Sequence, residues 1–96
     1  MPLLDELQHK RDAMLAIASK HSVSNVRLFG SVIRGEERPD SAIDLLVDMA
    51  EDRGFGDYLA LVEELEGLLA RRVEIVIGRS ISRHFRAFIE AEARPL

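Results

Sequence analysis

Hydrophobic residues recur at helical spacing in three parts of this chain. From Pro2 to about His21 the leucine, methionine and isoleucine residues fall on one side of a helix, and proline is favoured in a first helical turn. The segments 57–71 and 80–93 are amphipathic in the same way. Phe85 and Phe88 lie on the apolar side of the last segment, where core packing is the simplest explanation and a contact surface is the alternative.

Three apolar runs between polar or glycine-containing segments predict β-strands at residues 25–29, 43–49 and 73–77. In the second run, IDLLVDM, successive side chains of a strand point to opposite faces of the sheet. One face then carries Ile43, Leu45, Val47 and Met49, and the other carries Ala42, Asp44, Leu46 and Asp48.

The predicted order is helix, strand, a brief helical turn at residues 32–34, strand, helix, strand and helix. A strand, a helix and a strand over residues 43–77 normally form a parallel crossover. The short link between the first two strands permits an antiparallel pair. We therefore expect an α/β fold in which residues 1–96 form a single domain, a small mixed sheet with helices packed on it.

The composition is that of a soluble globular protein, since 47% of the residues are hydrophobic and 31% are charged. The chain has no cysteine, which excludes disulfides and thiolate metal sites. No apolar run approaches the roughly 20 residues of a membrane helix, and the first residues lack the apolar centre of a signal peptide. We expect a cytoplasmic protein without a membrane partner.

The net charge of −4 makes nucleic acid an unexpected direct ligand, because nucleic-acid binding depends on neutralising phosphates with Lys and Arg. The charge is uneven, however, and arginines gather in the last third of the chain. They indicate either solvated helix faces or a basic face that meets a triphosphate or an acidic partner. These arginines are Arg71, Arg72, Arg79, Arg83, Arg86 and Arg94.

A tight turn is followed along the chain by two strands that each carry an acid. Gly30 can adopt backbone angles closed to other residues, so that backbone N–H groups and the Ser31 hydroxyl can meet at a phosphate. Asp44 and Glu74 each interrupt an apolar strand, and a buried carboxylate needs a cation or an ion-pair partner. If these strands are neighbours, both carboxylates can reach one Mg²⁺, which prefers oxygen ligands. Solvent exposure of both at the sheet edge is the alternative.

The stretch from Phe29 to Val47 resembles the signature of the minimal nucleotidyltransferases, small members of the DNA polymerase β-like superfamily. That signature is Gly-Ser, about ten residues and Asp-x-Asp, with a third carboxylate on a later strand. The resemblance covers nearly the whole chain in length and element order. It implies that Gly30 and Ser31 bind the triphosphate of ATP, that Asp44 and Glu74 bind Mg²⁺, and that Arg34 pairs with phosphate oxygens or with a carboxylate. The third carboxylate is usually Asp, so Glu74 differs by one methylene.

Ala42 stands where the family has its first Asp. The resemblance implies two Mg²⁺ ions that share these carboxylates, one activating the attacking hydroxyl and one holding the triphosphate. Without the shared ligand we expect transfer to fall by orders of magnitude, although nucleotide can still bind. Asp48 lies roughly 13 Å from Asp44 along the strand, too far to substitute, and Asp40 can reach only if its loop folds inward. Because the neighbouring residues fit the family, the sequence favours an engineered Asp→Ala inactivation over a naturally degenerate member.

Free-standing proteins that resemble this family are commonly antitoxins paired with a HEPN-domain ribonuclease toxin. The resemblance implies a protein adenylyltransferase that forms a hetero-oligomer with the toxin and transfers AMP from ATP to one of its tyrosines, with this chain an inactive form. Two alternatives remain open. One is a non-catalytic antitoxin that neutralises a toxin by direct contact. The other is a nucleotidyltransferase subunit acting on RNA or a small molecule, although the acidic balance counts against RNA and the short chain leaves little room for a substrate domain.

Overall fold

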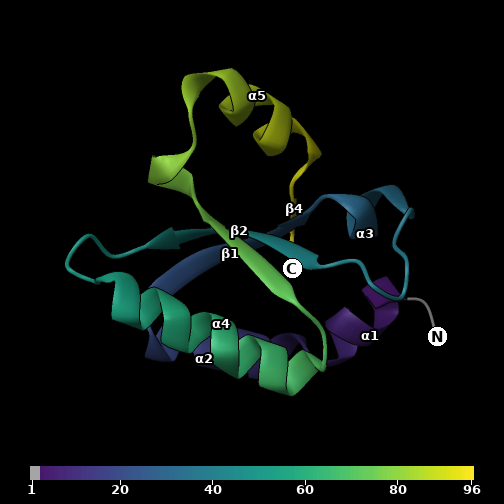
Figure 1. The fold of residues 1–96 in the computed structure, drawn as a ribbon, viewed down its shortest axis with the longest axis horizontal. Helices are drawn as coiled ribbons and strands as arrows, with labels where there is room; N and C mark the ends of the chain where they lie inside the picture. The colour runs from purple at the N-terminus through teal and green to yellow at the C-terminus, as the bar shows by residue number, and fades with distance from the viewer. Residues whose placement is uncertain (1–2) are drawn as a thin grey trace.

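The computed structural model describes residues 3–96, in which a four-stranded mixed sheet carries helices on both sides (Figure 1). The helices are α1 (Leu3–His9), α2 (Arg11–Lys20), α3 (Ser31–Arg34), α4 (Phe55–Leu69) and α5 (Arg83–Glu92), with a 3₁₀ turn η1 (Gly78–Ser80) before α5. The strands are β1 (Val23–Phe29), β2 (Ile43–Met49), β3 (Val73–Ile77) and β4 (Arg94–Pro95). Among the helices of these residues, none combines the length and the apolar character needed to cross a bilayer.

The strands lie in the order β3-β2-β1-β4, so that β2 lies between β3 and β1. β2 is parallel to β3, as the strand–helix–strand order predicts, and antiparallel to β1, as the short link between them permits. In this register Asp44 of β2 lies beside Glu74 of β3 on one side and Phe29 of β1 on the other. The two acidic strands predicted from the sequence are therefore neighbours.

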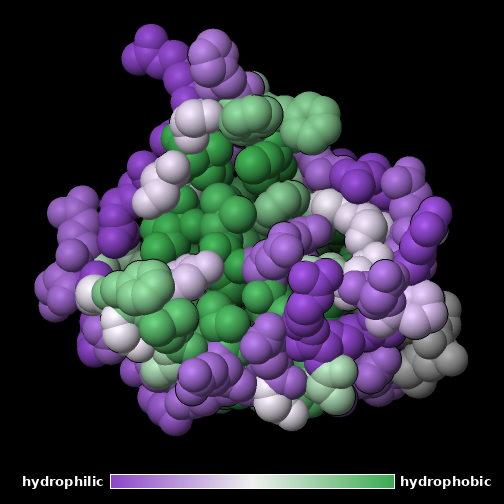
Figure 2. Space-filling model, in the orientation of Figure 1, coloured by the Kyte–Doolittle hydropathy of each residue, from purple (hydrophilic) through white to green (hydrophobic). Residues whose placement is uncertain are grey.

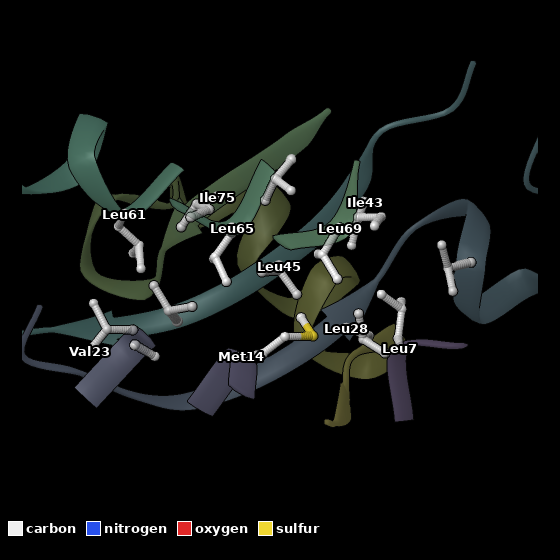
Figure 3. Packing of buried hydrophobic residues seen from close by; sticks show 14 of the residues in the cluster. Leu7, Met14, Val23, Leu28, Ile43, Leu45, Leu61, Leu65, Leu69 and Ile75 are labelled. Carbon is white, nitrogen blue, oxygen red and sulfur yellow. The ribbon is translucent and has the colours of Figure 1, made fainter. Parts of the chain in front are cut away.

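One face of the sheet packs on α2 and α4 and forms the hydrophobic core (Figure 3). In β2, Ile43, Leu45 and Val47 are at most 1% exposed, whereas Asp44 is half-buried and Asp48 is exposed on the opposite face. Full burial of each such side chain is worth about 1.5–3 kcal/mol. Because a shift of one residue would exchange the two faces, the core fixes the register of β2 and thereby directs Asp44 away from the core. Leu46 is the exception on the Asp44 face, since it too is buried.

The predicted N-terminal helix is two helices, α1 and α2, separated at Lys10. The break lets each short helix bury its own apolar side. Leu3 and Leu7 of α1 and Met14 and Ala18 of α2 are all buried. The helical spacing was therefore correct, but the expectation of one continuous helix was wrong. Pro2, where the predicted helix began, lies outside the described residues.

The C-terminal segment differs from the prediction in two ways. The last helix begins at Arg83 and not near residue 80, because η1 occupies residues 78–80. The chain then ends in a short strand, β4, that the sequence did not predict. The open edge of β1 holds β4, and the Leu96 N–H donates to the Val26 carbonyl at 3.1 Å. A two-residue strand has too few positions to show an alternating pattern.

The apolar side of α5 does not pack into the core. Phe85 is 62% exposed, Phe88 is 68% exposed, and no residue of α5 is buried. Figure 1 shows α5 on the side of the sheet away from α2 and α4, and Figure 2 shows hydrophobic surface over α5 and the adjoining part of the sheet. The simplest explanation of these phenylalanines was wrong, because periodicity identifies an apolar helix side without identifying what covers it.

Candidate functional site

The turn after β1 depends on glycine at position 30. Gly30 has φ 81° and ψ −153°, a region that side chains other than hydrogen rarely permit. A Cβ at this position would also overlap the Asp44 carboxylate. The sharp turn predicted from Gly30-Ser31 is thus formed, and it brings the backbone directly against Asp44. The half-buried Ser31 opens α3 one residue later.

Asp44 and Glu74 are the two acidic residues that the sheet brings together. They are register partners on β2 and β3, with Asp44 half-buried and Glu74 exposed. Burial, followed by the hydrogen bond and the repulsion from Glu74, raises the pKa of Asp44 to about 6, while Arg34 acts in the opposite direction. A cation between these carboxylates would relieve the cost of holding both ionised.

Arg34, at the end of α3, is held by two carboxylates. Its Nε donates to Glu36 at 3.2 Å and its Nη1 donates to Glu92 at 2.6 Å. The hydrogen bonds to Glu92 and Glu36 raise the pKa of Arg34 above its already high value. Of the two partners considered from the sequence, phosphate oxygens or a carboxylate, the structure contains the carboxylate.

Glu92 belongs to this site and was missed by the sequence reasoning. The Gly30 N–H donates to Glu92 Oε2 at 3.1 Å, and the other oxygen accepts from Arg34. These bonds, with that to Arg34 the larger effect, lower the pKa of Glu92. Glu92 lies 62 residues from Gly30, and no local motif marks it. Only the pairing of β4 with β1 brings the end of α5 to the turn.

Ala42, the residue before β2, adds no third carboxylate to Asp44 and Glu74. Ala42 is half-buried and precedes Asp44 by two residues, so continuing the strand alternation directs it to the Asp44 face. Asp48 does not substitute, because it accepts hydrogen bonds from Arg27 at 3.1 Å and Asn25 at 3.0 Å. Asp40 is exposed in its loop.

The donor set suits one hard cation better than two. Within residues 3–96, no three His, Cys, Asp or Glu side chains converge as a metal-binding group. Asp44 and Glu74 offer carboxylate oxygens, which with phosphate oxygens and water can complete the six ligands of Mg²⁺. Ala42 has no oxygen on its side chain to share with a second ion.

Most of the arginines concentrated in the last third of the chain bind backbone carbonyls. Arg71 donates to the carbonyls of residues 38 and 39, and Arg72 donates to that of residue 40. Arg79 donates to the Met49 carbonyl, and Arg94 donates to the carbonyls of residues 91–93 at the end of α5. These four side chains hold loops and a helix end.

A separate apolar groove of about 470 Å³ lies beside the start of α4. Met49, Phe55, Tyr58 and Ile77 contribute to its walls. The Tyr58 hydroxyl donates to the Ile75 carbonyl at 3.1 Å, so this side chain joins α4 to β3. None of the residues of the carboxylate pair or the glycine turn lines this groove.

Comparison with known proteins agrees with this geometry. The family model "Polymerase beta, Nucleotidyltransferase" matches residues 13–96. The protein adenylyltransferase MntA of Thermococcus cleftensis is 36% identical over 73 residues, which cover 76% of this chain and 70% of that protein. A solved structure assigned to a minimal nucleotidyltransferase has a TM-score of 0.87 and 44% identity, covering 97% of this chain and 95% of its own. A toxin–antitoxin structure with AMP-PNP has a TM-score of 0.75 at 21% identity, a likeness of fold, over 88% of this chain and 69% of its own.

Proposed function

Because this chain belongs to the polymerase beta nucleotidyltransferase family, we propose that it is an antitoxin of the protein adenylyltransferase type whose catalytic site is inactivated at Ala42. Its intact form transfers AMP from Mg-ATP to a tyrosine of a HEPN ribonuclease toxin, with which it forms a hetero-oligomer. The observation that carries this proposal is the placement of Asp44 beside Glu74, against the Gly30 turn. The named relatives, a protein adenylyltransferase and a toxin–antitoxin pair, support it. A cytoplasmic location follows from the proposed use of ATP and from a toxin that acts on RNA.

In the proposed reaction the tyrosine oxygen forms a bond to the α-phosphorus of ATP, and the bond from that phosphorus to pyrophosphate breaks. Asp44 and Glu74 would hold Mg²⁺ through their carboxylate oxygens, and the bound cation would neutralise charge and lower the pKa of the tyrosine hydroxyl. The hydroxyl proton passes to solvent water as the new bond forms. Gly30 and Ser31 hold the triphosphate through backbone N–H groups and the hydroxyl, and Arg34 pairs with phosphate oxygens. The nucleophile comes from the partner protein.

Ala42 lacks the side-chain oxygen of one proposed cation ligand, whereas the other proposed site residues are present. An aspartate at position 42 would add a carboxylate that two cations could share. Without it, the chain retains ligands for one cation and for the triphosphate. We therefore expect nucleotide binding without appreciable transfer.

The test compares this chain with its Ala42→Asp variant. Each is incubated with Mg²⁺, ATP labelled at the α-phosphate and the helical protein encoded by the neighbouring gene, and protein-bound label is measured. We expect the variant to transfer at least about 100-fold faster, because the shared ligand is restored. The Asp40→Ala change in both backgrounds is the matched control, since Asp40 is exposed outside the site.

Equal transfer by the two chains would contradict the proposed inactivation at position 42. Labelling of the partner at a residue other than tyrosine would contradict the proposed nucleophile. A restored variant that labels nothing, while both chains still neutralise the toxin, would favour the second candidate function.

That second candidate is neutralisation by direct contact, without catalysis. The exposure of Phe85 and Phe88 on α5 favours it, because large exposed apolar side chains on one helix side are typical of protein contacts. In this case Phe85→Ser and Phe88→Ser should weaken binding of the toxin in a calorimetric titration. The Leu59→Ser change on α4 is the control, since Leu59 is also exposed, at 44%.

A further inference from the structure

The phosphate-binding turn of this chain already holds an anion, and that anion is one of its own side chains. Both oxygens of the Glu92 carboxylate are engaged, one by the Gly30 N–H at 3.1 Å and the other by Arg34 at 2.6 Å. The Glu92 side chain is only 16% exposed. Two donors that we assign to the triphosphate are thus occupied by a carboxylate.

The Gly30 N–H makes this occupation exclusive. Arginine has five N–H donors and can serve two anions, but a backbone amide has a single hydrogen. A phosphate oxygen that accepts from Gly30 must therefore replace Glu92 Oε2. A triphosphate beside Glu92 would also meet a like charge, and such juxtapositions are unfavourable.

The backbone around Glu92 is anchored to the rest of the fold on its C-terminal side only. On its C-terminal side, β4 pairs with β1, and Arg94 donates to the carbonyls at the end of α5. On its N-terminal side, α5 has no buried residue. The end of α5 lies close to α3, where Glu92 meets Arg34 (Figure 1). Movement of α5 or a change of the Glu92 rotamer can therefore withdraw the carboxylate while the core stays packed.

We infer that Glu92 is an autoinhibitory residue that occupies the phosphate-binding turn and must leave before a nucleoside triphosphate binds. This inference rests on the nucleotide site of the proposed function. A site that is free for only part of the time binds with an apparent affinity reduced by that fraction. Occupation for nine-tenths of the time would weaken binding about tenfold.

The experiment measures ligand affinity and does not depend on transfer. Calorimetry gives the dissociation constants of Mg-ATP and of inorganic tripolyphosphate for the present chain and for Glu92→Gln and Glu92→Ala. We expect Glu92→Ala to bind both probes about tenfold more tightly, with Glu92→Gln between the two, since it loses the charge but can still accept a hydrogen bond. Glu90→Gln is the control, because Glu90 is exposed on the same helix and its side chain makes no hydrogen bond or ion pair within residues 3–96.

A second readout follows the turn itself. The Gly30 amide resonance in an ¹⁵N–¹H spectrum should shift on Glu92→Ala, and tripolyphosphate should shift it further in that variant at lower concentrations than in the unchanged chain. Circular dichroism melting confirms that each variant is folded.

The outcomes separate this inference from the proposed function. Tighter binding only in the Glu92 variants supports autoinhibition. Equal binding by all four chains overturns it and leaves the nucleotide site intact, with Glu92 a structural partner of Arg34. Binding by none of the folded chains overturns both.

Discussion

Asp44 is the residue whose ionisation links the site to stability. Its pKa is raised from 3.8 to about 6 by burial and by Glu74. Between these two values the folded protein binds a proton that the unfolded chain has released. The free energy of unfolding therefore falls as the pH rises from about 4 to 6, and the contribution is fully lost above that window.

Replacing Asp44 by Asn should flatten this pH dependence and raise stability above pH 6, where the native carboxylate is ionised next to Glu74. Urea unfolding of both chains at a series of pH values from 4 to 8 measures the free energy of unfolding. Asp52→Asn is the matched control, since Asp52 is exposed in the loop before α4. If the free energy of unfolding of Asp44→Asn changed with pH in parallel with that of the unchanged chain, the pH dependence would not come from Asp44.

Gly30 is the residue whose backbone geometry the site cannot do without. Its positive φ and its contact with Asp44 predict that Gly30→Ala loses more than the roughly 1–3 kcal/mol of backbone strain alone. Gly67→Ala in α4 should instead gain about 0.5–1 kcal/mol, because nothing lies within 4 Å of its added Cβ. Denaturant midpoints of the two variants, measured side by side, should move in opposite directions. A neutral Gly30→Ala would mean that the turn relaxes freely.

At the scale of elements, α5 is set apart by its lack of buried side chains. The core helices α2 and α4 bury Met14, Leu61 and Leu65 against the sheet, so their unfolding requires loss of the core. A ten-residue helix with no buried side chain has little packing to stabilise it beyond its own hydrogen bonds. The anchoring of α5 comes from Glu92 and β4 at its end.

Native-state hydrogen exchange should therefore show α5 opening before the rest of the fold. We expect amides 87–91 of α5 to exchange at least about tenfold faster than amides 45–47 of β2 after correction for intrinsic rates. Glu92→Ala should widen the difference, since it removes one anchor. Protection of α5 equal to that of β2 would instead indicate that its phenylalanines are covered in solution.

At the scale of the molecule, the hydrophobic core and the candidate site lie on opposite faces of the sheet. The face towards α2 and α4 holds the buried core, and the opposite face presents Asp44 with the Glu74 strand beside it. Four segments that are distant in the sequence meet there: the Gly30 turn, β2, β3 and the end of α5. A strained turn and a carboxylate pair are costly features, and the core on the other face supplies the stability that offsets them.

The sequence by itself determined the elements whose signals are local. Strands β2 and β3 were predicted with their observed limits, because apolar runs and alternation are read within a few residues. Gly30 as a turn and Asp44 as an acid in an apolar strand were likewise visible, as was the departure at Ala42. The parallel direction of β2 and β3 followed from the order strand, helix, strand, and the short link after β1 permitted the antiparallel pair, whereas the sequence left open whether β2 and β3 are neighbours.

Tertiary structure alone decided the contacts that join distant residues. Periodicity identified the apolar side of α5 but could not tell whether the core covers it, because burial depends on which face of the sheet the helix reaches. The break at Lys10 depends on how two short helices each meet the core. Glu92 carries no local signal at all, and it enters the site only because the edge of β1 captures β4. Local patterns reflect backbone preference and side-chain alternation, whereas the contact of Glu92 with the Gly30 turn reflects where the folded chain brings its last helix.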